Sequence, residues 1–321
     1  MLPQTNLHIS ELEMALAHIP VLPDELVDLL KPIDGEIALD ATFGAGGHAA
    51  AVAAHIGACG AMIACDRDPS VAEYYRDFVR EAPCHSDFYH GDFADVLAER
   101  PDSSLDIVYM DLGVSSMQLD RRERGFSYAY DAPLDMRMDP ESAVSAADLV
   151  NALGADELTD IFRRYGEERY AINIARRIVA ERERRPLSTT GELVDVIKQA
   201  IPTPARFAAG NPARRVFQAL RIVVNSELES LARGLEEGYR ALKPGGRLAA
   251  ISFHSLEDRM VKEFFRGHAA GCICPPGLPQ CVCGHEPTMR VLTRRPIVPR
   301  AREIEMNPRS KSAKLRVAVK L

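Results

Sequence analysis

Short, mostly apolar runs that each end in an acidic residue recur in the first third of the chain. Residues 37–39 precede Asp40, residues 61–65 precede Asp66, and residues 104–110 precede Asp111. Runs of about four to eight apolar residues between turn signals are typical of buried strands. Apolar residues at helical spacing, as in residues 71–79, separate these runs. The pattern predicts an α/β fold with a mostly parallel sheet, whose acidic residues meet at the carboxyl edge.

Two further segments complete the predicted sheet. Residues 242–246 read Leu-Lys-Pro-Gly-Gly, which predicts a turn after a helix, and residues 247–253 then form an apolar strand. Residues 315–321 alternate apolar and polar side chains, the pattern of a half-exposed last strand. Asp68 stands before Pro69, where an acidic side chain is typical of a helix N-cap.

A long interval separates Gln118 from Leu242, and it exceeds what a structureless loop in a compact domain would span. Apolar residues have helical spacing in 156–165, 171–183 and 191–200. We therefore expect residues 1–119 and 223–321 to form the main α/β domain. Residues 120–222 would form a helical insertion that opens from the Asp111 edge.

A glycine-rich segment follows the first predicted strand and reads Asp40-Ala-Thr-Phe-Gly44-Ala-Gly46-Gly47-His48. Clustered glycines before a helix allow a nucleotide-like cofactor to approach the backbone closely. The segment also fits the loose dinucleotide pattern G-x-G-x-x-G/A, which by itself is weak evidence. A carboxylate four residues before the first glycine would repel a pyrophosphate, but it suits an amino group and a sulfonium. The expected cofactor is S-adenosylmethionine.

Two later positions agree with a nucleoside cofactor of either kind. Asp66 ends the second predicted strand, 20 residues after Gly46, where an acid accepts hydrogen bonds from a ribose diol. Phe93 follows a weak strand at residues 86–89 and could lie against an adenine ring. A buried phenylalanine is also a common core residue, so the sequence leaves both roles for Phe93 open.

Charge is distributed unevenly along the 321 residues, of which 46% are hydrophobic and 26% charged. The net charge is −7, yet the segment from Glu286 to the end carries ten Lys or Arg and three Glu. Arg206, Arg214, Arg215 and Arg221 add a stretch without acids. Such clusters can contact phosphates, and they can equally be solvated surface. With no long apolar run or leader sequence, we expect a cytoplasmic chain without a membrane partner.

Four of the seven cysteines fall in residues 272–283, at Cys272, Cys274, Cys281 and Cys283. Four thiolates could hold Zn²⁺ tetrahedrally, with His285 as a spare ligand, although C-x-C is less diagnostic than C-x-x-C. A reduced, flexible loop is the alternative, and disulfides are disfavoured in the cytosol. The remaining cysteines, at positions 59, 65 and 84, are expected to be small buried side chains.

Taken in order, the strand-end acids, the glycine loop and the Leu-Lys-Pro-Gly-Gly turn resemble a class I S-adenosylmethionine-dependent methyltransferase. That fold is Rossmann-like, with a mostly parallel sheet and an antiparallel last strand. Nearly the whole chain resembles, more narrowly, the ribosomal RNA small subunit methyltransferase H family. The motifs that carry this resemblance are residues 18–21, 40–48, 111–116, 118–120, 123–126, 133–139, 165–169, 217–221, 252–259 and 307–310.

Members of that family methylate N4 of a cytidine in the decoding centre of 16S rRNA. The resemblance therefore implies 16S rRNA within the small ribosomal subunit as partner and no DNA. The position of the insertion, which opens from the Asp111 edge, would let it grip that RNA. It carries over as cofactor contacts Gly46, Gly47, His48, Asp66, Phe93, Asp111 and Gln118. The residue pattern itself adds Asp40 and Gly44 to this set.

The N4 amine of cytosine is a poor nucleophile, so a site must align it and accept a hydrogen bond from its N–H. Enzymes that methylate amines on DNA typically carry Asn or Asp before Pro-Pro-aromatic, whereas this chain has Asp111-Leu-Gly-Val. Phe126 or Tyr128 could replace the missing stacking ring. Asp111 would hold the cofactor, the amine or both. His254 would accept the proton or serve as a structural histidine.

Other functions remain open at this stage. An amino methyltransferase acting on DNA or another RNA would use the same residues. A non-catalytic ribosome-assembly factor that binds RNA would lack cofactor binding, although the intact Gly44, Gly46, Asp66 and Asp111 argue against that loss. A dehydrogenase is a more distant alternative, separable by testing NAD against S-adenosylmethionine.

Overall fold

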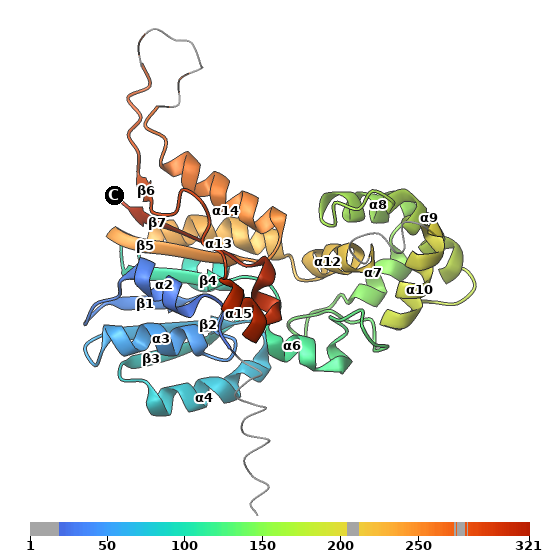
Figure 1. The fold of residues 1–321 in the computed structure, drawn as a ribbon, viewed down its shortest axis with the longest axis horizontal. Coiled ribbons are helices and arrows are strands. Elements are labelled where there is room, and N and C mark those ends of the chain that lie inside the picture. The colour runs from blue at the N-terminus through green and yellow to red at the C-terminus, as the bar shows by residue number, and fades with distance from the viewer. Residues whose placement is uncertain (1–18, 204–211, 273, 275–279, 281) are drawn as a thin grey trace, which may run out of the picture. The chain divides into compact units, whose positions relative to one another are not determined.

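The computed structural model describes residues 19–203, 212–272, 274, 280 and 282–321 (Figure 1). The chain divides into two compact units. One unit combines Met1–Gly113 with Glu229–Leu321, and the other is Val114–Leu228. The second unit contains the whole of the interval 120–222. Among the described helices, none is long and apolar enough to cross a membrane.

A seven-stranded sheet forms the centre of the first unit, in the order β3-β2-β1-β4-β5-β7-β6. Neighbouring strands from β3 to β5 are parallel, and β7 is antiparallel to both β5 and β6. The sheet is therefore mostly parallel with antiparallel pairing at one end, as the sequence predicted. The strands are β1 (Ile37–Asp40), β2 (Ala61–Asp66), β3 (His85–His90), β4 (Leu105–Asp111), β5 (Leu242–Ser252), β6 (Met289–Val291) and β7 (Lys314–Lys320).

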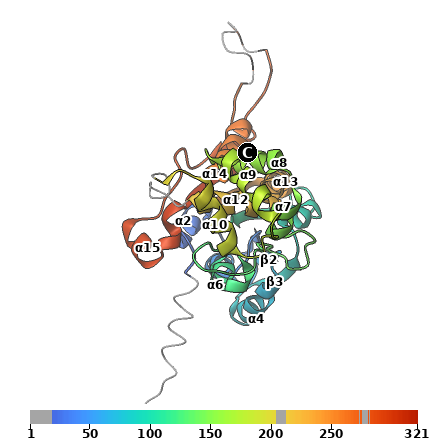
Figure 2. The ribbon, with the colours of Figure 1, turned by 90° about the vertical axis from the view of Figure 1, so that its right-hand side faces the viewer.

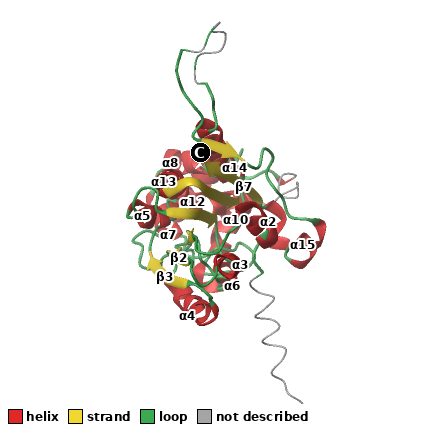
Figure 3. Ribbon diagram, turned by 90° about the vertical axis from the view of Figure 1, so that its left-hand side faces the viewer, coloured by secondary structure: helices red, strands yellow, loops and turns green. Residues whose placement is uncertain are grey.

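Helices cover both faces of this sheet because its central strands are apolar on both sides. Leu39 in β1 and Val108 in β4 are fully buried. Figure 3 shows α5 and α13 on one side of the strands and α2 on the other. The helical segments of this unit are α2 (Pro23–Leu30), α3 (Gly47–Ile56), η1 (Pro69–Val71), α4 (Ala72–Glu81), α5 (Phe93–Ala98), α13 (Glu227–Ala241), α14 (Ser255–His268), α15 (Ala301–Met306) and η3 (Pro308–Ser312).

Two local predictions can be compared with these elements. Asp68 caps η1 as expected, since its Oδ1 accepts a hydrogen bond from the Ser70 backbone N–H at 3.0 Å. The separate turn expected at residues 242–246 is instead part of β5, which begins directly after α13. The pairing register shifts there, with Leu105 opposite Leu242 and Ile107 opposite Arg247. The Pro-Gly-Gly residues are thus accommodated as an irregularity within the strand.

The second unit is helical, and α6 to α10 and α12 are labelled in Figure 2. Three of them, α8 (Ala155–Arg164), α9 (Ala171–Arg182) and α10 (Thr190–Ala200), match the three helices predicted from apolar spacing. Leu158, Ile174 and Ile197 lie fully buried in a core that these helices share. The other described segments are α6 (Ser116–Asp120), η2 (Arg122–Arg124), α7 (Ala146–Ala152) and α12 (Pro212–Val224).

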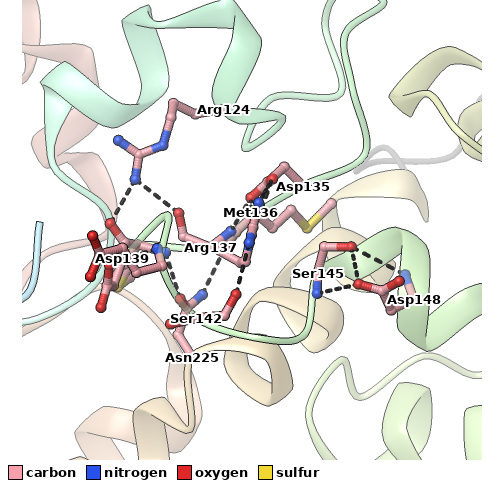
Figure 4. A network of polar contacts seen from close by, with 11 residues as sticks. Arg124, Asp135, Met136, Arg137, Asp139, Ser142, Ser145, Asp148 and Asn225 are labelled. Carbon is pink, nitrogen blue, oxygen red and sulfur yellow. Dashed lines mark hydrogen bonds and ion pairs between the residues drawn. The ribbon is translucent and has the colours of Figure 1, made fainter.

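A polar network fixes the loop around Met136 in this unit (Figure 4). Met136 has a left-handed backbone with φ of 64°. Asn225 Nδ2 donates to the Met136 carbonyl at 2.8 Å. Arg137 pairs with Asp135 at 2.6 Å, and Arg124 donates to the Arg137 carbonyl at 2.9 Å. These charge-assisted bonds stabilise a strained turn in one of the motifs that resemble the family.

Candidate active site

Three acidic residues end adjacent parallel strands at one edge of the sheet. Asp40, Asp66 and Asp111 are the last residues of β1, β2 and β4. Asp40 lies opposite Ala64 in β2 and opposite Tyr109 in β4, so the three strands finish within two residues of one another. The sheet register therefore gathers the acids where ligands bind in open α/β folds.

The loop after β1 connects these three strand ends through hydrogen bonds. Thr42 Oγ1 accepts a hydrogen bond from the Asp111 backbone N–H at 2.6 Å. The Phe43 N–H donates to the Cys65 carbonyl at 2.9 Å, and the Gly44 N–H donates to Asp66 Oδ2 at 2.8 Å. Thr42 was not among the residues singled out in the sequence, because a threonine between Asp and Gly carries no distinctive signal.

Glycines in this loop are required by backbone conformation and by space. Gly46 has φ of 79°, and a Cβ there would lie 2.7 Å from the Phe43 ring. A Cβ on Gly47, the first residue of α3, would lie 3.0 Å from Pro20 Cγ. Gly44 also has a positive φ, of 54°, but no close neighbour. The loop thus leads into a helix N-terminus whose backbone N–H groups favour a partly negative or polar ligand group.

Asp40 is a buried acid, and one of its two carboxylate oxygens has no hydrogen-bond partner in the part of the chain that the structure describes. Its exposed fraction is 1%. Oδ1 accepts a hydrogen bond from the Thr42 N–H at 3.0 Å, whereas Oδ2 is buried and has no hydrogen-bond partner among the described residues. Burial raises the pKa of Asp40 to about 7, and the neighbouring His48 opposes this rise. A cation at Oδ2 would stabilise the charged form of this carboxylate.

The His48 ring faces the carboxyl group of Asp111. His48 Nε2 lies 2.8 Å from the Val21 carbonyl, which can only accept, so Nε2 carries the proton. The other ring nitrogen, Nδ1, faces Asp111 Oδ2 at 3.7 Å. Burial lowers the pKa of His48, while burial and then the Glu257 charge raise the pKa of Asp111 to about 8. Near neutral pH the pair is therefore a neutral imidazole beside a protonated acid.

Asp66 is bound on both carboxylate oxygens by backbone N–H groups. Oδ1 accepts from Asp68 at 2.9 Å and Oδ2 from Gly44 at 2.8 Å. Each oxygen of a carboxylate can accept a second hydrogen bond, so two sites remain for hydroxyl donors. Burial raises the pKa of Asp66.

Arg67 follows Asp66 directly, and the sequence contains no signal for its role, because an arginine between two aspartates matches no motif. Its Nη2 donates to Asp92 Oδ2 at 2.7 Å and to Ser230 Oγ at 3.1 Å. Asp92 in turn caps α5 by accepting from the Ala94 N–H at 2.8 Å. Arg67 therefore joins the loops after β2 and β3 to α13.

The aromatic candidates are mostly enclosed by protein. Phe93 is 8% exposed, and a Cβ on Gly234 in α13 would lie 2.2 Å from its ring. Phe126 is buried in the core of the second unit. Tyr128, in the same unit, is half-buried and packs edge-on against Phe217 with ring centroids 5.8 Å apart.

His254 and Gln118 both take part in helix capping. The Glu257 N–H donates to His254 Nδ1 at 3.3 Å, and His254 Nε2 faces Glu257 Oε1 at 3.0 Å. The same glutamate accepts from the Phe253 N–H at 2.8 Å. Gln118 belongs to the second unit, where its Oε1 accepts from the Ser115 N–H at 3.0 Å.

The segment that orients His48 is held by residues near the end of the chain. Glu303 in α15 accepts a hydrogen bond from the Leu22 N–H at 2.9 Å, where Leu22 has a left-handed φ of 53°. Asn307 Nδ2 donates to the Ile19 carbonyl at 3.1 Å. The sequence motifs at 18–21 and 307–310 therefore meet in space, which no spacing rule in the sequence indicated. Residue 18 itself lies outside the described residues.

Several of the basic residues counted in the sequence are neutralised within the fold. Arg221 forms two bonds of 2.8 Å with Glu227. Lys314 and Arg316 pair with Asp258 at 3.0 and 2.7 Å. The basic C-terminal count thus overstates the charge available to a partner.

Exposed arginines gather instead where α8 ends beside the start of α12. The backbone of Gly166 lies against that of Arg215, since a Cβ on Gly166 would be 2.6 Å from the Arg215 carbonyl oxygen. The exposed side chains are those of Arg163, Arg164, Arg214 and Arg215. Arg215 also pairs with the buried Glu168 at 3.7 Å. Arg206 lies outside the described residues.

The strand order and the acids at the carboxyl edge define a class I S-adenosylmethionine-dependent methyltransferase fold, which confirms the class predicted from the sequence. The family model described as the MraW methylase family matches residues 15–321. The chain belongs to this family, and it is a methyltransferase.

Curated relatives are similar over almost the full length. A ribosomal RNA small subunit methyltransferase H from Heliobacterium modesticaldum is 48% identical, over 96% of this chain and 100% of its own. The protein of the same name from Citrifermentans bemidjiense is 50% identical, over 95% and 98%. Among solved structures, a SAM dependent methyltransferase from Aquifex aeolicus has a TM-score of 0.41 at 11% identity, covering 97% of this chain and 98% of that one.

Proposed function

We propose that this protein transfers a methyl group from S-adenosylmethionine to N4 of a cytidine in the decoding centre of 16S rRNA. The names of its curated relatives support ribosomal RNA of the small subunit as the substrate. The resemblance of the sequence motifs to the methyltransferase H family supports the cytidine and its N4 position. The structural observation that carries the proposal is that Asp40 and Asp111 are strand-end acids, each with a buried oxygen that has no hydrogen-bond partner in the described part of the chain.

The residues present fit a cationic nucleoside cofactor. Asp40 Oδ2 and Asp111 Oδ1 are buried and lack hydrogen-bond partners among the described residues. A sulfonium or an ammonium beside these oxygens would stabilise both carboxylates in their charged form. A pyrophosphate at the same place would meet like charge. The Asp40 position thus favours S-adenosylmethionine over a dinucleotide.

Each proposed contact has a distinct part in binding. Asp66 offers two acceptor sites to the ribose hydroxyls, and the positive φ of Gly46 exposes the loop backbone to the cofactor. His48 restrains Asp111 from the side of α3. Phe93 and Gln118 remain contacts on the strength of the resemblance alone. The proposed cofactor-binding residues are Asp40, Gly44, Gly46, Gly47, His48, Asp66, Phe93, Asp111 and Gln118.

Asp111 is the residue we propose to act on the target amine. S-adenosylmethionine supplies, when bound, an electrophilic methyl group on a cationic sulfur. In its charged form Asp111 accepts a hydrogen bond from N4–H, which orients the amine and increases its electron density. The carboxylate, with a pKa of about 8 in the free protein, can then take the proton that N4 loses. For His254 we propose a structural role, because Nδ1 accepts the Glu257 N–H; Nε2 is buried without a hydrogen-bond partner among the described residues and lies 3.0 Å from Glu257 Oε1.

The second unit is the proposed RNA-recognition domain. Its exposed arginines at the α8–α12 junction can contact phosphates, and their guanidinium groups suit bidentate phosphate binding. Such contacts would be spread over a broad footprint. We therefore expect an assembled or partly assembled small subunit to be a much better substrate than a short oligonucleotide.

The deciding experiment measures transfer of a radiolabelled methyl group to small subunits that lack the modification, followed by nucleoside analysis. We expect N4-methylated cytidine from the wild-type protein. With Asp111→Ala we expect a large loss of single-turnover rate even at saturating cofactor. Label in another nucleoside would refute the proposed substrate. Absence of cofactor binding in calorimetry would instead favour a non-catalytic assembly factor.

A further inference from the structure

In the segment that joins α14 to β6, the described residues bury no apolar side chain. Every described residue between Gly271 and Pro287 is exposed or half-buried, and Val282 has an exposed fraction of 78%. A chain segment of this length needs buried contacts or a cross-link to offset the entropy of ordering it. The described part of the segment supplies no hydrophobic core.

Three cysteine side chains converge within this segment. The Sγ atoms of Cys272, Cys274 and Cys283 all lie within 4.8 Å of one another. The distance from Cys283 Sγ to Cys272 Sγ is 3.8 Å. In a tetrahedral zinc–thiolate site with Zn–S bonds of about 2.3 Å, neighbouring sulfurs lie about 3.8 Å apart. The observed separation, which also allows an S–H···S hydrogen bond between two thiols, matches that of two thiolates sharing one metal ion, and the third sulfur lies within 4.8 Å of both.

Backbone hydrogen bonding around the thiols agrees with this geometry. The Val282 N–H donates to Cys274 Sγ at 3.5 Å. Hydrogen bonds from outer groups to metal-bound ligands are a regular feature of metal sites. A disulfide would join only two of the three sulfurs, at about 2.05 Å, and would leave the third sulfur unexplained.

We infer that Cys272, Cys274 and Cys283 bind one structural Zn²⁺ ion as thiolates. The sequence supplies a fourth thiol at Cys281, which lies outside the described residues, and His285 lies outside the three-cysteine group. Once a fourth protein ligand completes the tetrahedral set, such an ion has no open position for catalysis. The ion would stabilise the link between α14 and β6, and this inference does not depend on the proposed methyl transfer.

Metal analysis of the full-length protein, purified under reducing conditions without a metal-affinity tag, tests the inference. We expect about one zinc per chain, and Cys272→Ser with Cys283→Ser should lower retained zinc by about tenfold or more. Cys59→Ser is the matched control, because Cys59, which the sequence wrongly predicted to be buried, is an exposed thiol outside the cluster. The same comparison with Cys281→Ser and His285→Gln identifies the fourth ligand.

The absorption spectrum of the cobalt-substituted wild-type protein is a second test, and it does not depend on whether the cysteine variants fold. The wild-type protein with Co²⁺ should show thiolate-to-metal charge-transfer bands and the intense visible bands of a tetrahedral site. Cofactor affinity should be the same before and after metal removal by a chelator. Less than about a tenth of a zinc per chain after reconstitution with Zn²⁺ would overturn the inference. So would a mass showing a Cys272–Cys283 disulfide in the freshly purified protein.

Discussion

At the scale of single residues, the site depends on acids whose protonation is set by their surroundings. Burial raises the pKa of Asp40 to about 7 and that of Asp111 to about 8. Each carboxyl therefore keeps its proton in the folded protein at pH values where it would lose it in the unfolded chain. This contribution to stability is complete below the unfolded pKa of 3.8 and disappears as the pH rises through about 7 to 8.

The affinity for S-adenosylmethionine should rise with pH across the same interval. A bound cation favours the charged carboxylates, so binding releases protons wherever Asp40 and Asp111 begin protonated. We expect up to about a tenfold gain in affinity per pH unit for each carboxyl below its pKa. Titration calorimetry between pH 6 and 9, in buffers of different ionisation enthalpy, would measure both the affinity and the protons released.

S-adenosylhomocysteine is the natural control for this prediction, because it lacks the sulfonium charge. Its affinity should depend less on pH. In Asp40→Asn, the part of the pH dependence near pH 7 should disappear, together with the corresponding fall in stability of the free protein. A pH dependence that is equal for both ligands would show that the sulfonium does not interact with these carboxylates.

Asp66 should contribute to binding without contributing to the chemical step. We expect Asp66→Ala to weaken S-adenosylmethionine binding by about 1.5 to 3 kcal/mol, the cost of losing charge-assisted bonds to hydroxyl groups. Single-turnover rates at saturating cofactor should change far less than in Asp111→Ala. Asp87→Ala, on the exposed part of β3, serves as the control. Wild-type affinity in Asp66→Ala would remove Asp66 from the site.

The sequence predicted which acids end the strands, because an apolar run followed by Asp is a local signal. It could not predict their protonation. That depends on burial, on the Glu257 charge for Asp111 and, for Asp40, on the His48 ring, whose Nε2 is bound by the Val21 carbonyl 27 residues away. The sequence also could not indicate that the Glu257 backbone N–H, three residues further on, donates a hydrogen bond to His254 Nδ1.

At the scale of elements, regular patterns were predictable and irregular ones were not. The amphipathic helices α8 to α10 were located within a residue or two from their apolar spacing. β6 has three residues and pairs only with β7, so it leaves no periodicity to detect. The direct passage from α13 into β5 also escaped prediction, because Pro-Gly-Gly is typical of a turn and here lies within an irregular strand.

The bond between α15 and the segment before α2 should affect the active site from a distance. Glu303→Ala removes the acceptor for the Leu22 N–H and loosens the segment whose Val21 carbonyl fixes His48. We expect about 1 to 2 kcal/mol of lost stability and a higher KM for S-adenosylmethionine. Thermal unfolding and initial-rate kinetics would measure the two effects.

Glu303→Gln is the matched variant, since its amide oxygen can still accept the same hydrogen bond. It should restore most of the affinity and stability lost in the alanine variant. If the alanine and glutamine variants bind the cofactor equally well, the hydrogen bond does not position His48.

At the scale of the whole molecule, charge is better judged from the structure than from residue counts. The C-terminal segment is strongly basic in the sequence. In the structure, however, Lys314 and Arg316 form ion pairs with Asp258. Lys320 donates hydrogen bonds to three backbone carbonyls. The exposed arginines at the α8–α12 junction are the better candidates for an RNA surface.

Reversing the charge of Arg214 and Arg215 should weaken RNA association and flatten its salt dependence. Each lost phosphate contact removes about one released counterion from the salt slope. Cofactor affinity should hardly change. RNA affinity across a salt series, beside calorimetry with the cofactor, measures both properties in one variant. Reversal at Arg76 and Arg80 on α4 introduces the same charge change on another exposed helix and should leave the slope unaltered.

The position of β7 has a consequence for how the protein is made. β7 follows β5 and β6 in the sequence, yet it lies between them in the sheet. During translation β5 therefore presents an unpaired edge, and β6 has no neighbour, until Lys320 has left the ribosome. A message cut short before residue 314 would yield a chain with an open sheet edge, which is prone to aggregation. Premature termination should thus produce a chain that aggregates or is degraded by proteases, rather than an enzyme of reduced activity.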